Sequence, residues 1–300
     1  MHEVIGREAR ISAIAREYAA SPEYTLVVSP DNRSRAEINS AIHRELQEQG
    51  IVGKREHTMQ MLAPRQELTG ADRSWAQRYQ PNDVLHYSRT SKETGIGKGE
   101  YARVLAVNGP ENLLTVLRGN EQATYDPRRQ MGVSVYRAEE KAFSIGDRIQ
   151  LTAPNQELKI ANRELASIES IGTNGAMRLK LDSGRSVEFG AQGFPHIDHG
   201  YAVTSHSSQG QTAERVLIHA DTELGAKDLL NHRMAYVSVS RGQWDAQIFT
   251  NDRDKLVQAL SHDVSHKSAL QPEQAISGAP KIGPASEHVV ERSLGYGLGL

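Results

Sequence analysis

The sequence contains no cysteine among its 300 residues, which excludes disulfide bonds and leaves any metal site to histidine and carboxylate side chains. No apolar run approaches the roughly 18 residues of a membrane-spanning helix. The first residues do not form a basic and then apolar leader, so no secretory signal is expected. We therefore expect a cytoplasmic protein without membrane insertion.

Strong charge of one sign is also missing, because the formal net charge is −2. Nucleic-acid-binding domains usually show a clear basic bias. If this chain binds nucleic acid, the positive charge must therefore be concentrated in a local groove. The 38% of apolar residues nevertheless suffice for hydrophobic cores. A chain of this length exceeds the usual size of one domain, and we expect two or three.

The first segment predicts a helix, a strand and a second helix. Apolar residues recur at near-helical spacing over 5–18, a β-rich run covers 24–28, and a helical pattern returns over 36–46. The turn Ser29–Asn32 supplies capping side chains for the second helix. This is a strand-to-helix unit of an α/β domain, in which ligands bind beyond the carboxyl ends of the strands.

Two short β-rich blocks follow, and they resemble each other at a constant offset. Strands are predicted at 84–85 and 102–107 in the first block and at 149–151 and 165–171 in the second. Short strands separated by Gly, Asn and Asp turns favour small antiparallel barrels. A duplicated module is predicted, with chance similarity as the alternative, from four pairs that are each 64 residues apart: Asp83 and Asp147, Lys98 and Asn162, Leu117 and Leu181, Tyr125 and Phe189.

The α/β pattern resumes near Gly200, with buried strands predicted at 216–218, 235–239 and 246–249. Beyond Leu260 the chain is rich in Ser, Pro, Gly and Gln, which predicts a linker or a flexible tail.

Two motifs in this part carry chemistry. YAVTSHSSQGQT, Tyr201–Thr212, leads from apolar residues into hydroxyls, an imidazole, an amide and a glycine. YVSVSRG, Tyr236–Gly242, is a β-branched stretch that predicts a strand delivering Arg241 to a cleft. An arginine at such a strand end is suited to stabilise negative charge on a phosphoryl group. The alternative for a lone arginine is an ordinary surface ion pair.

These motifs resemble the last two motifs of a superfamily 1 DNA helicase, in the form found in TraI/TrwC-type (MobF) conjugative relaxase-helicases, whose helicase region is RecD-like. The resemblance covers roughly residues 1–255 and is most specific in the two motifs. It implies an α/β fold, namely a second RecA-like motor lobe with a parallel sheet and flanking helices, interrupted by an inserted β-rich region of one or two small SH3-like barrels.

The resemblance also implies a division of the chain into four parts. We expect the first part of the lobe at 1–65, the barrel insertion at 66–198 with repeats at 80–130 and 144–194, the second part of the lobe at 199–258, and a flexible tail at 259–300.

The resemblance assigns Arg241 as the arginine finger. Nucleotide binding is assigned to Arg33, Arg35, Gln209, Gly210 and Thr212, and contact with DNA to Thr204, Ser205, His206, Ser207 and Ser208. Capping hydroxyls at a helix start are the alternative for 204–208, and ordinary surface arginines for the 33–35 turn. RecD-like helicases usually have lysine at position 207 and glutamate at 212, so a weaker grip on DNA or a degenerate motor also fits.

Other signals are discounted. Gly97-Lys98 resembles a phosphate-binding loop but lacks the glycine and hydroxyl residue that this loop requires, which leaves a hairpin turn. His196 and His199 have no third ligand nearby in the sequence, so no metal site is predicted. Tyr236 and Trp244 are expected in the core or lining the cleft, with base stacking as the alternative.

The implied parent is an ATP-dependent DNA helicase and relaxase that moves 5′ to 3′ along single-stranded DNA in plasmid transfer. ATP and Mg²⁺ would be held mainly by a first lobe, whose ATP-binding loop is not in this sequence. The implied partners are single-stranded DNA, and the N-terminal motor lobe and relaxase domain of the same polypeptide. No enzyme activity is assigned to the fragment alone.

Two other functions remain open. The first is a catalytically inactive, helicase-like module that binds single-stranded DNA and carries a translocation signal for the type IV secretion coupling protein. The second is an RNA-directed or repair helicase, because phosphate contacts carry little base information.

Overall fold

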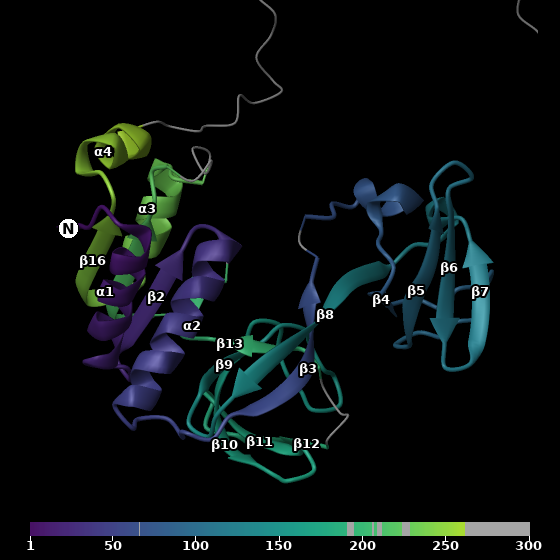
Figure 1. Cartoon of the computed structure of the whole chain (residues 1–300), viewed down its shortest axis with the longest axis horizontal. Helices are drawn as coiled ribbons and strands as arrows, with labels where there is room; N and C mark the ends of the chain where they lie inside the picture. The colour runs from purple at the N-terminus through teal and green to yellow at the C-terminus, as the bar shows by residue number, and fades with distance from the viewer. Residues whose placement is uncertain (66, 191–194, 206, 209–211, 224–228, 262–300) are drawn as a thin grey trace, which may run out of the picture. The chain divides into compact units, whose positions relative to one another are not determined.

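One parallel and two antiparallel sheets carry the fold in the computed structural model (Figure 1). The structure describes residues 1–65, 67–190, 195–205, 207–208, 212–223 and 229–261. The parallel sheet has the order β1-β16-β15-β2-β14. Its strands are β1 (His2–Glu3), β2 (Thr25–Ser29), β14 (Ala202–Thr204), β15 (Ala213–Ala220) and β16 (Gly242–Thr250).

Helices α1 (Arg7–Ala19) and α2 (Asn32–Glu48) pack against one face of this sheet. Their apolar side chains share a core with Val27, Leu217 and Phe249 from three strands. Asp31 caps the start of α2, because its carboxylate accepts the backbone N–H of Ser34 at 2.7 Å. The predicted cap and both predicted helices are therefore confirmed.

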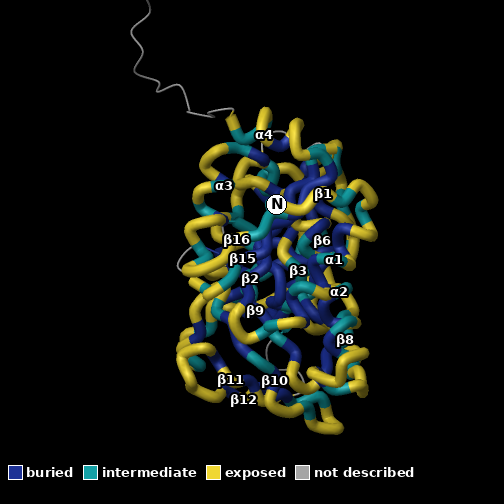
Figure 2. Tube along the Cα trace, turned by 90° about the vertical axis from the view of Figure 1, so that its left-hand side faces the viewer, coloured by how far each residue is buried: buried dark blue, intermediate teal, exposed yellow. Residues whose placement is uncertain are grey.

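The other sheet face and the last helices form two smaller cores. Leu26, Val28, Val216 and Ile218 pack together with Leu165 from the inserted region. β2 is buried at every residue, as expected for the interior of a parallel sheet (Figure 2). Helices α3 (His232–Val239) and α4 (Arg253–Ser261) share a separate apolar cluster.

The chain leaves the parallel sheet after α2 and returns to it at β14. β2 is paired with β15 on one side and with β14 on the other, at Ala202↔Val27 and Thr204↔Ser29. Asn39 of α2 fixes the return, because its side-chain amide bonds the backbone N–H and C=O of Ala202. The described residues between these points form a β-rich insertion.

The insertion forms two antiparallel sheets. The six-stranded sheet has the order β3-β8-β4-β5-β6-β7, and the five-stranded sheet has the order β12-β11-β10-β9-β13. The strands are β3 (His57–Pro64), β4 (Asp83–Tyr87), β5 (Tyr101–Asn108), β6 (Leu113–Arg118), β7 (Glu121–Tyr125), β8 (Val133–Phe143), β9 (Arg148–Leu151), β10 (Leu165–Ile171), β11 (Met177–Leu181), β12 (Ser186–Phe189) and β13 (Ile197–His199). Short 3-10 helices lie at Asp72–Ser74, Ala76–Arg78 and Pro127–Arg129.

We call β4–β7 with the first half of β8 the first module, and β9–β13 the second module. Each has its own apolar core. β8 joins them, because residues 133–137 pair with β4, whereas its second half pairs with β3 and contributes Phe143 to the second core.

Both modules share one strand plan at an offset of 64 residues. Each has a β-bulge in its second strand, between Val104 and Ala106 and between Ile168 and Ser170. The recurring pairs are Leu85↔Ala102 with Ile149↔Ala166, and Tyr87↔Val133 with Leu151↔Ile197. The third strand departs from this offset by one residue. Leu114↔Tyr125 recurs as Met177↔Phe189, so Tyr125 and Phe189 are 64 residues apart but Leu114 and Met177 are 63 apart.

Some sequence predictions need correction. Residues 235–239 were predicted as a strand but lie in α3, because Asn231 caps a helix there and Met234 and Ser238 bury one helical face. Tyr236 and Trp244 are 70% and 84% exposed, so they are not core residues. Helix α4 was not predicted, and the tail beyond it, 262–300, lies outside the described residues. No described helix is long and apolar enough to cross a membrane.

Candidate nucleic-acid groove and nucleotide edge

A groove lies beyond the carboxyl ends of β2 and β14, where they face the two modules. Its volume is about 580 Å³. Its lining includes the predicted site residues Arg35, Thr204 and Ser207, together with three arginines that the sequence did not single out: Arg65, Arg73 and Arg163. This is the strand end at which parallel α/β sheets bind ligands.

The groove is moderately basic, since it has four arginines against Asp31 and Asp198. Two of the arginines are held by carboxylates. Arg35 donates to Asp198 at 2.9 Å, and Arg65 donates to Asp83 at 2.6 Å. Burial lowers the pKa of Arg65, but its bonds to Glu67 and Asp83 outweigh burial and raise it, so the side chain stays charged.

Two buried polar atoms at the groove have no hydrogen-bond partner within the described part of the chain. They are Nε of Arg73 and Oγ1 of Thr152. Arg73 is anchored through another guanidinium nitrogen, which donates to the backbone oxygen of Val133 at 3.2 Å. Buried polar groups are normally satisfied, so such atoms mark a place where water or a polar ligand binds.

The predicted hydroxyl turn after β14 is largely bonded to itself. The Thr204 hydroxyl donates to Ser207 Oγ at 3.0 Å, and the buried Ser208 hydroxyl donates to the backbone oxygen of Ser205. The Ser205 hydroxyl oxygen is buried without a partner among the described residues. Of the residues of this turn that the structure describes, only Thr204 and Ser207 line the groove. His206, also predicted to contact DNA, lies outside the described residues.

Arg241 and Thr212 lie together at the opposite, amino edge of the parallel sheet. The backbone N–H of Ala213, next to Thr212, donates to the oxygen of Arg241 at 2.9 Å. Arg241 follows the last turn of α3, and its guanidinium bonds the oxygen of Val237 at 3.1 Å and the Ser240 hydroxyl at 3.1 Å. Arg241 is therefore delivered by a helix end rather than by the predicted strand. Gln209 and Gly210 lie outside the described residues.

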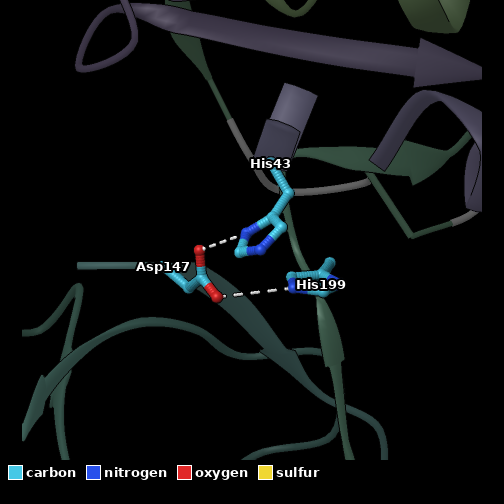
Figure 3. Close-up of side chains that lie close together, drawn as sticks. All are labelled: His43, Asp147 and His199. Carbon is cyan, nitrogen blue, oxygen red and sulfur yellow. Dashed lines mark hydrogen bonds and ion pairs between the residues drawn. The ribbon is translucent and has the colours of Figure 1, made fainter. Parts of the chain in front are cut away.

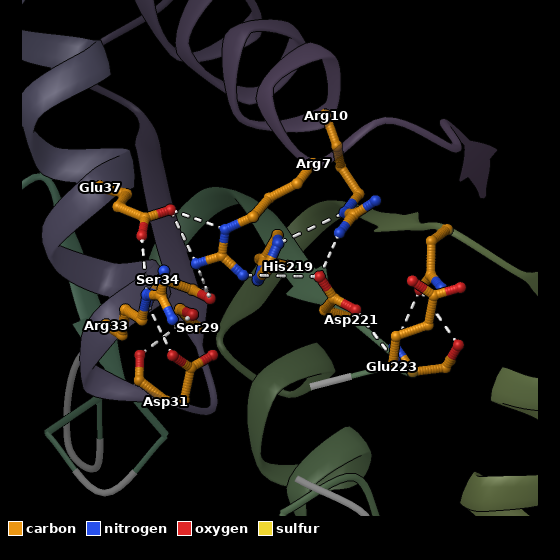
Figure 4. Close-up of polar contacts among 12 residues, drawn as sticks. Arg7, Arg10, Ser29, Asp31, Arg33, Ser34, Glu37, His219, Asp221 and Glu223 are labelled. Atoms are coloured by element: carbon orange, nitrogen blue, oxygen red, sulfur yellow. Dashed lines mark hydrogen bonds and ion pairs between the residues drawn. The ribbon is translucent and has the colours of Figure 1, made fainter. Parts of the chain in front are cut away.

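The strand geometry separates Arg33 and Arg35 from Arg241. Arg33 and Arg35 lie in the first turn of α2, beyond the carboxyl end of β2. Arg33 is largely exposed and pairs with Glu37 one turn later (Figure 4). The predicted nucleotide-binding set is thus split between the two ends of the sheet, with Thr212 at the end that carries Arg241.

A buried polar network at the carboxyl edge escaped the sequence predictions. Arg10 of α1 is 1% exposed and forms an ion pair with Asp221, and it bonds His219 of β15 at 3.4 Å (Figure 4). Burial lowers the pKa of Arg10 and lowers that of His219 to about 4. No local sequence pattern indicates these contacts, because the partners lie some two hundred residues apart.

A cluster of two histidines and one aspartate joins α2 to the second module (Figure 3). His43 Nδ1 lies 2.8 Å from Asp147 Oδ1, and His199 Nε2 lies 3.5 Å from Asp147 Oδ2. Burial tends to raise the pKa of Asp147, but contacts from His199, His43 and Tyr201 hold it well below its usual range. The fold therefore does not complete the His196 and His199 pair: it joins His199 to His43 and Asp147, whereas His196 Nε2 lies 2.7 Å from the Tyr101 hydroxyl.

Comparisons with known proteins find similarity to helicases and to conjugation proteins. A family model for the UvrD-like helicase C-terminal domain matches residues 199–244, which include both motifs. The chain is 24% identical over 284 residues to the multifunctional conjugation protein TraI of Escherichia coli K12, covering 90% of this chain and 16% of TraI. It is 28% identical over 116 residues to the conjugal transfer protein TraA of Rhizobium radiobacter, covering 38% of this chain and 10% of TraA.

Solved Pif1 helicases are similar in structure at low identity. A structure of two coordinating Pif1 helicases at forked double-stranded DNA matches 88% of this chain and 50% of that chain, with 12% identity and a TM-score of 0.39. Bacteroides Pif1 in complex with ADP-AlF3 and single-stranded DNA matches 85% of this chain and 51% of that chain, with 13% identity and a TM-score of 0.38.

The α/β plan, the two motifs and the sequence relatives agree with one another. The chain spans about a sixth of the length of TraI. The resemblance predicted from the two motifs is confirmed, and the chain is homologous to the helicase region of TraI-type conjugative relaxases.

Proposed function

We propose that this chain is the second motor lobe of an ATP-dependent helicase that moves 5′ to 3′ along single-stranded DNA within a conjugative relaxase. The observation that carries the proposal is the adjacency of Arg241 and Thr212 at one edge of the parallel sheet. This edge would face a first lobe that binds ATP and Mg²⁺. ATP, when bound there, supplies the phosphoryl group whose transfer drives movement.

Arg241 is suited to act as an arginine finger. It follows α3, and the next residue has to be glycine, because a Cβ on Gly242 would lie 2.5 Å from the backbone oxygen of Asp245. The sharp entry into β16 thus fixes where the guanidinium emerges. Its donors, with the exposed Thr212 hydroxyl nearby, suit phosphate oxygens, and the charge stabilises phosphoryl transfer when the lobes close.

The test is Arg241→Ala in the full-length relaxase-helicase. We expect ATP turnover to fall by roughly 10³-fold, the scale of an arginine finger, with nearly unchanged affinity for single-stranded DNA. Arg16→Ala is the matched control, because Arg16 is an exposed arginine on the outer face of α1. Turnover within twofold of wild type in the Arg241 variant would disprove the finger role.

We also propose that the 580 Å³ groove holds the sugar-phosphate backbone of single-stranded DNA. The support is the unpartnered Arg73 Nε and Thr152 Oγ1 beside the Thr204 and Ser207 hydroxyls. Such donors contact phosphate without reading bases, as a translocating motor requires. Exposed Trp244 offers a stacking surface elsewhere, and we assign it no contact.

The groove is tested by titrating a fluorescent oligonucleotide at several salt concentrations. Arg73→Ala should weaken binding and reduce the slope of log affinity against log salt by about 0.7, the value for one phosphate on a single strand. Arg178→Ala is the control, because Arg178 is an exposed arginine of β11 away from the groove. Equal losses in both variants would place the DNA elsewhere.

The division into parts follows the same proposal. The lobe would comprise 1–65 and 199–258, the insertion 66–198 would consist of duplicated, SH3-like barrels, and 259–300 would be a tail. The recurring register of the two modules supports duplication. The expected partners are the first lobe and the relaxase domain of the same polypeptide. The comparisons do not favour an inactive module that is read by a secretion coupling protein.

A further inference from the structure

We propose that His43, Asp147 and His199 bind a zinc-type divalent cation that fastens helix α2 to the second module. His43 comes from α2, Asp147 directly precedes β9, and His199 ends β13. One ligand atom from each residue lies within 4.8 Å of the others (Figure 3). Ligand atoms placed tetrahedrally around zinc lie about 3.4 Å apart, and the two histidines lie 2.8 and 3.5 Å from the two different oxygens of Asp147, Oδ1 and Oδ2.

The donor types favour zinc over magnesium or calcium. Two imidazoles and one carboxylate are a common set for zinc, whereas the alkaline-earth ions prefer oxygen alone. His199 Nε2 faces Asp147 and, within the described part of the chain, has no hydrogen-bond partner. Three protein ligands leave a fourth position for water.

The surrounding groups suit a metal-bound state. His43 directs Nδ1 to the cluster while Nε2 lies 3.4 Å from Glu56, so a carboxylate would orient the imidazole from behind. Tyr201 donates its hydroxyl hydrogen to Asp147 Oδ1 at 2.5 Å, which fixes the carboxylate. These are the supporting contacts that metal ligands generally have.

The first module shows that the fold itself does not require this set. The residue equivalent to Asp147 is Asp83, whose partner is the permanent cation Arg65, and the residue equivalent to His199 is Val135. The second module therefore has an imidazole where the same strand plan accepts a valine, and its buried aspartate is paired with an imidazole of α2 instead of an arginine. A specific ligand explains this difference better than packing does.

A cation can reach the cluster from solvent. His43 and His199 both line a cavity of about 440 Å³ whose other lining residues include Glu56, Glu139 and Glu140. These three carboxylates outnumber the cations Arg44 and Lys141 that also line the cavity, so the lining favours entry of a cation.

The test uses this chain after treatment with a chelator. Zn²⁺ should bind with one equivalent per chain and raise the midpoint of thermal unfolding, and Co²⁺ should give the visible absorption of a tetrahedral site. His199→Val, which copies the first module, should keep the fold and weaken Zn²⁺ binding at least tenfold. His57→Gln on β3 is the control, because this histidine lies outside the cluster, and it should bind as wild type does.

The proposal is overturned if wild type does not bind Zn²⁺ stoichiometrically, or if His199→Val binds as tightly as the control. If His199→Val does not fold, imidazole NMR signals of wild type decide the matter. Co²⁺ should then shift the signals of His43 and His199 selectively, and equal effects on other histidines would show adventitious binding only.

Discussion

The two modules use one strand plan but neutralise the same buried carboxylate differently. In both, an aspartate at the start of the first strand accepts the backbone N–H of the residue three positions earlier, Gln80 for Asp83 and Ser144 for Asp147. Asp83 is paired with Arg65 from the chain that enters its own module. Asp147 is paired with His43 of α2 instead. The turn before each module requires the aspartate carboxylate. The charged partner of that carboxylate then determines which other segment is fastened to the module.

The largest effect is expected from removing the cation of the first module. Arg65→Met leaves Asp83, which is 2% exposed, without its charged partner, and we expect a loss of about 3–5 kcal/mol in the free energy of unfolding. Urea denaturation measures it. The double variant Arg65→Met/Asp83→Leu should recover part of this loss. A double variant no more stable than the single one would show that Asp83 matters through its backbone bond.

A pH effect distinguishes the modules through His196, which is 1% exposed and stands where the first module has Gly132. Burial lowers its pKa to about 4. The unfolded chain therefore binds more protons between pH 6.5 and 4, and stability should fall by up to about 3 kcal/mol as pH falls through this window. His196→Gln should flatten the profile and leave the contributions of His86 and His219, whose pKa values burial also lowers. An unchanged profile would place the titration elsewhere.

A smaller loss in the free energy of unfolding is expected from substituting Gly200, which lies where the chain returns from the second module to the parallel sheet. A Cβ there would lie 2.6 Å from the backbone carbon of Ile149, whereas the first module has Tyr136 at the equivalent position. Gly200→Ala should cost about 1–3 kcal/mol, as overpacking does. Gly190→Ala is the control in the same module, because a Cβ there meets nothing within 4 Å. Equal stability of the two variants would contradict the close approach.

The smallest effect is expected from exchanging an exposed cross-strand pair. Thr115 and Thr124 share a hydroxyl bond of 2.9 Å in the first module, where the second has the ion pair of Arg178 and Glu188. Replacing the ion pair by two threonines should change the free energy of unfolding by less than about 0.5 kcal/mol. Thermal unfolding at low and high salt measures it. A larger, salt-dependent loss would mean that the pair stabilises the sheet.

Much of the fold was predictable because its signals are local. Buried strands such as Val216–Ile218, the Asp31 cap and the strand at 165–171 follow from periodicity and turn chemistry. The stretch around Tyr236 failed because β-branched residues favour a strand, whereas the Asn231 cap and packing against α4 select a helix.

The site was predictable only in part, for the same reason. Arg241, Thr212, Thr204 and Ser207 belong to continuous motifs, so the sequence named them. Arg73 and Thr152 of the groove, and His43 beside Asp147, are brought together from distant segments. Nothing in a linear pattern indicates such contacts.

The pairing of β2 with β14 has a consequence for how the molecule is made. Val27 finds Ala202 only after the whole insertion has been synthesised, so this edge cannot form early on the ribosome. The modules contain mostly short-range hairpins, which form quickly, whereas a distant parallel pairing forms slowly. We expect the two modules to fold first and to bring the two halves of the lobe together. Until then the edges of β2 remain unpaired and can pair wrongly.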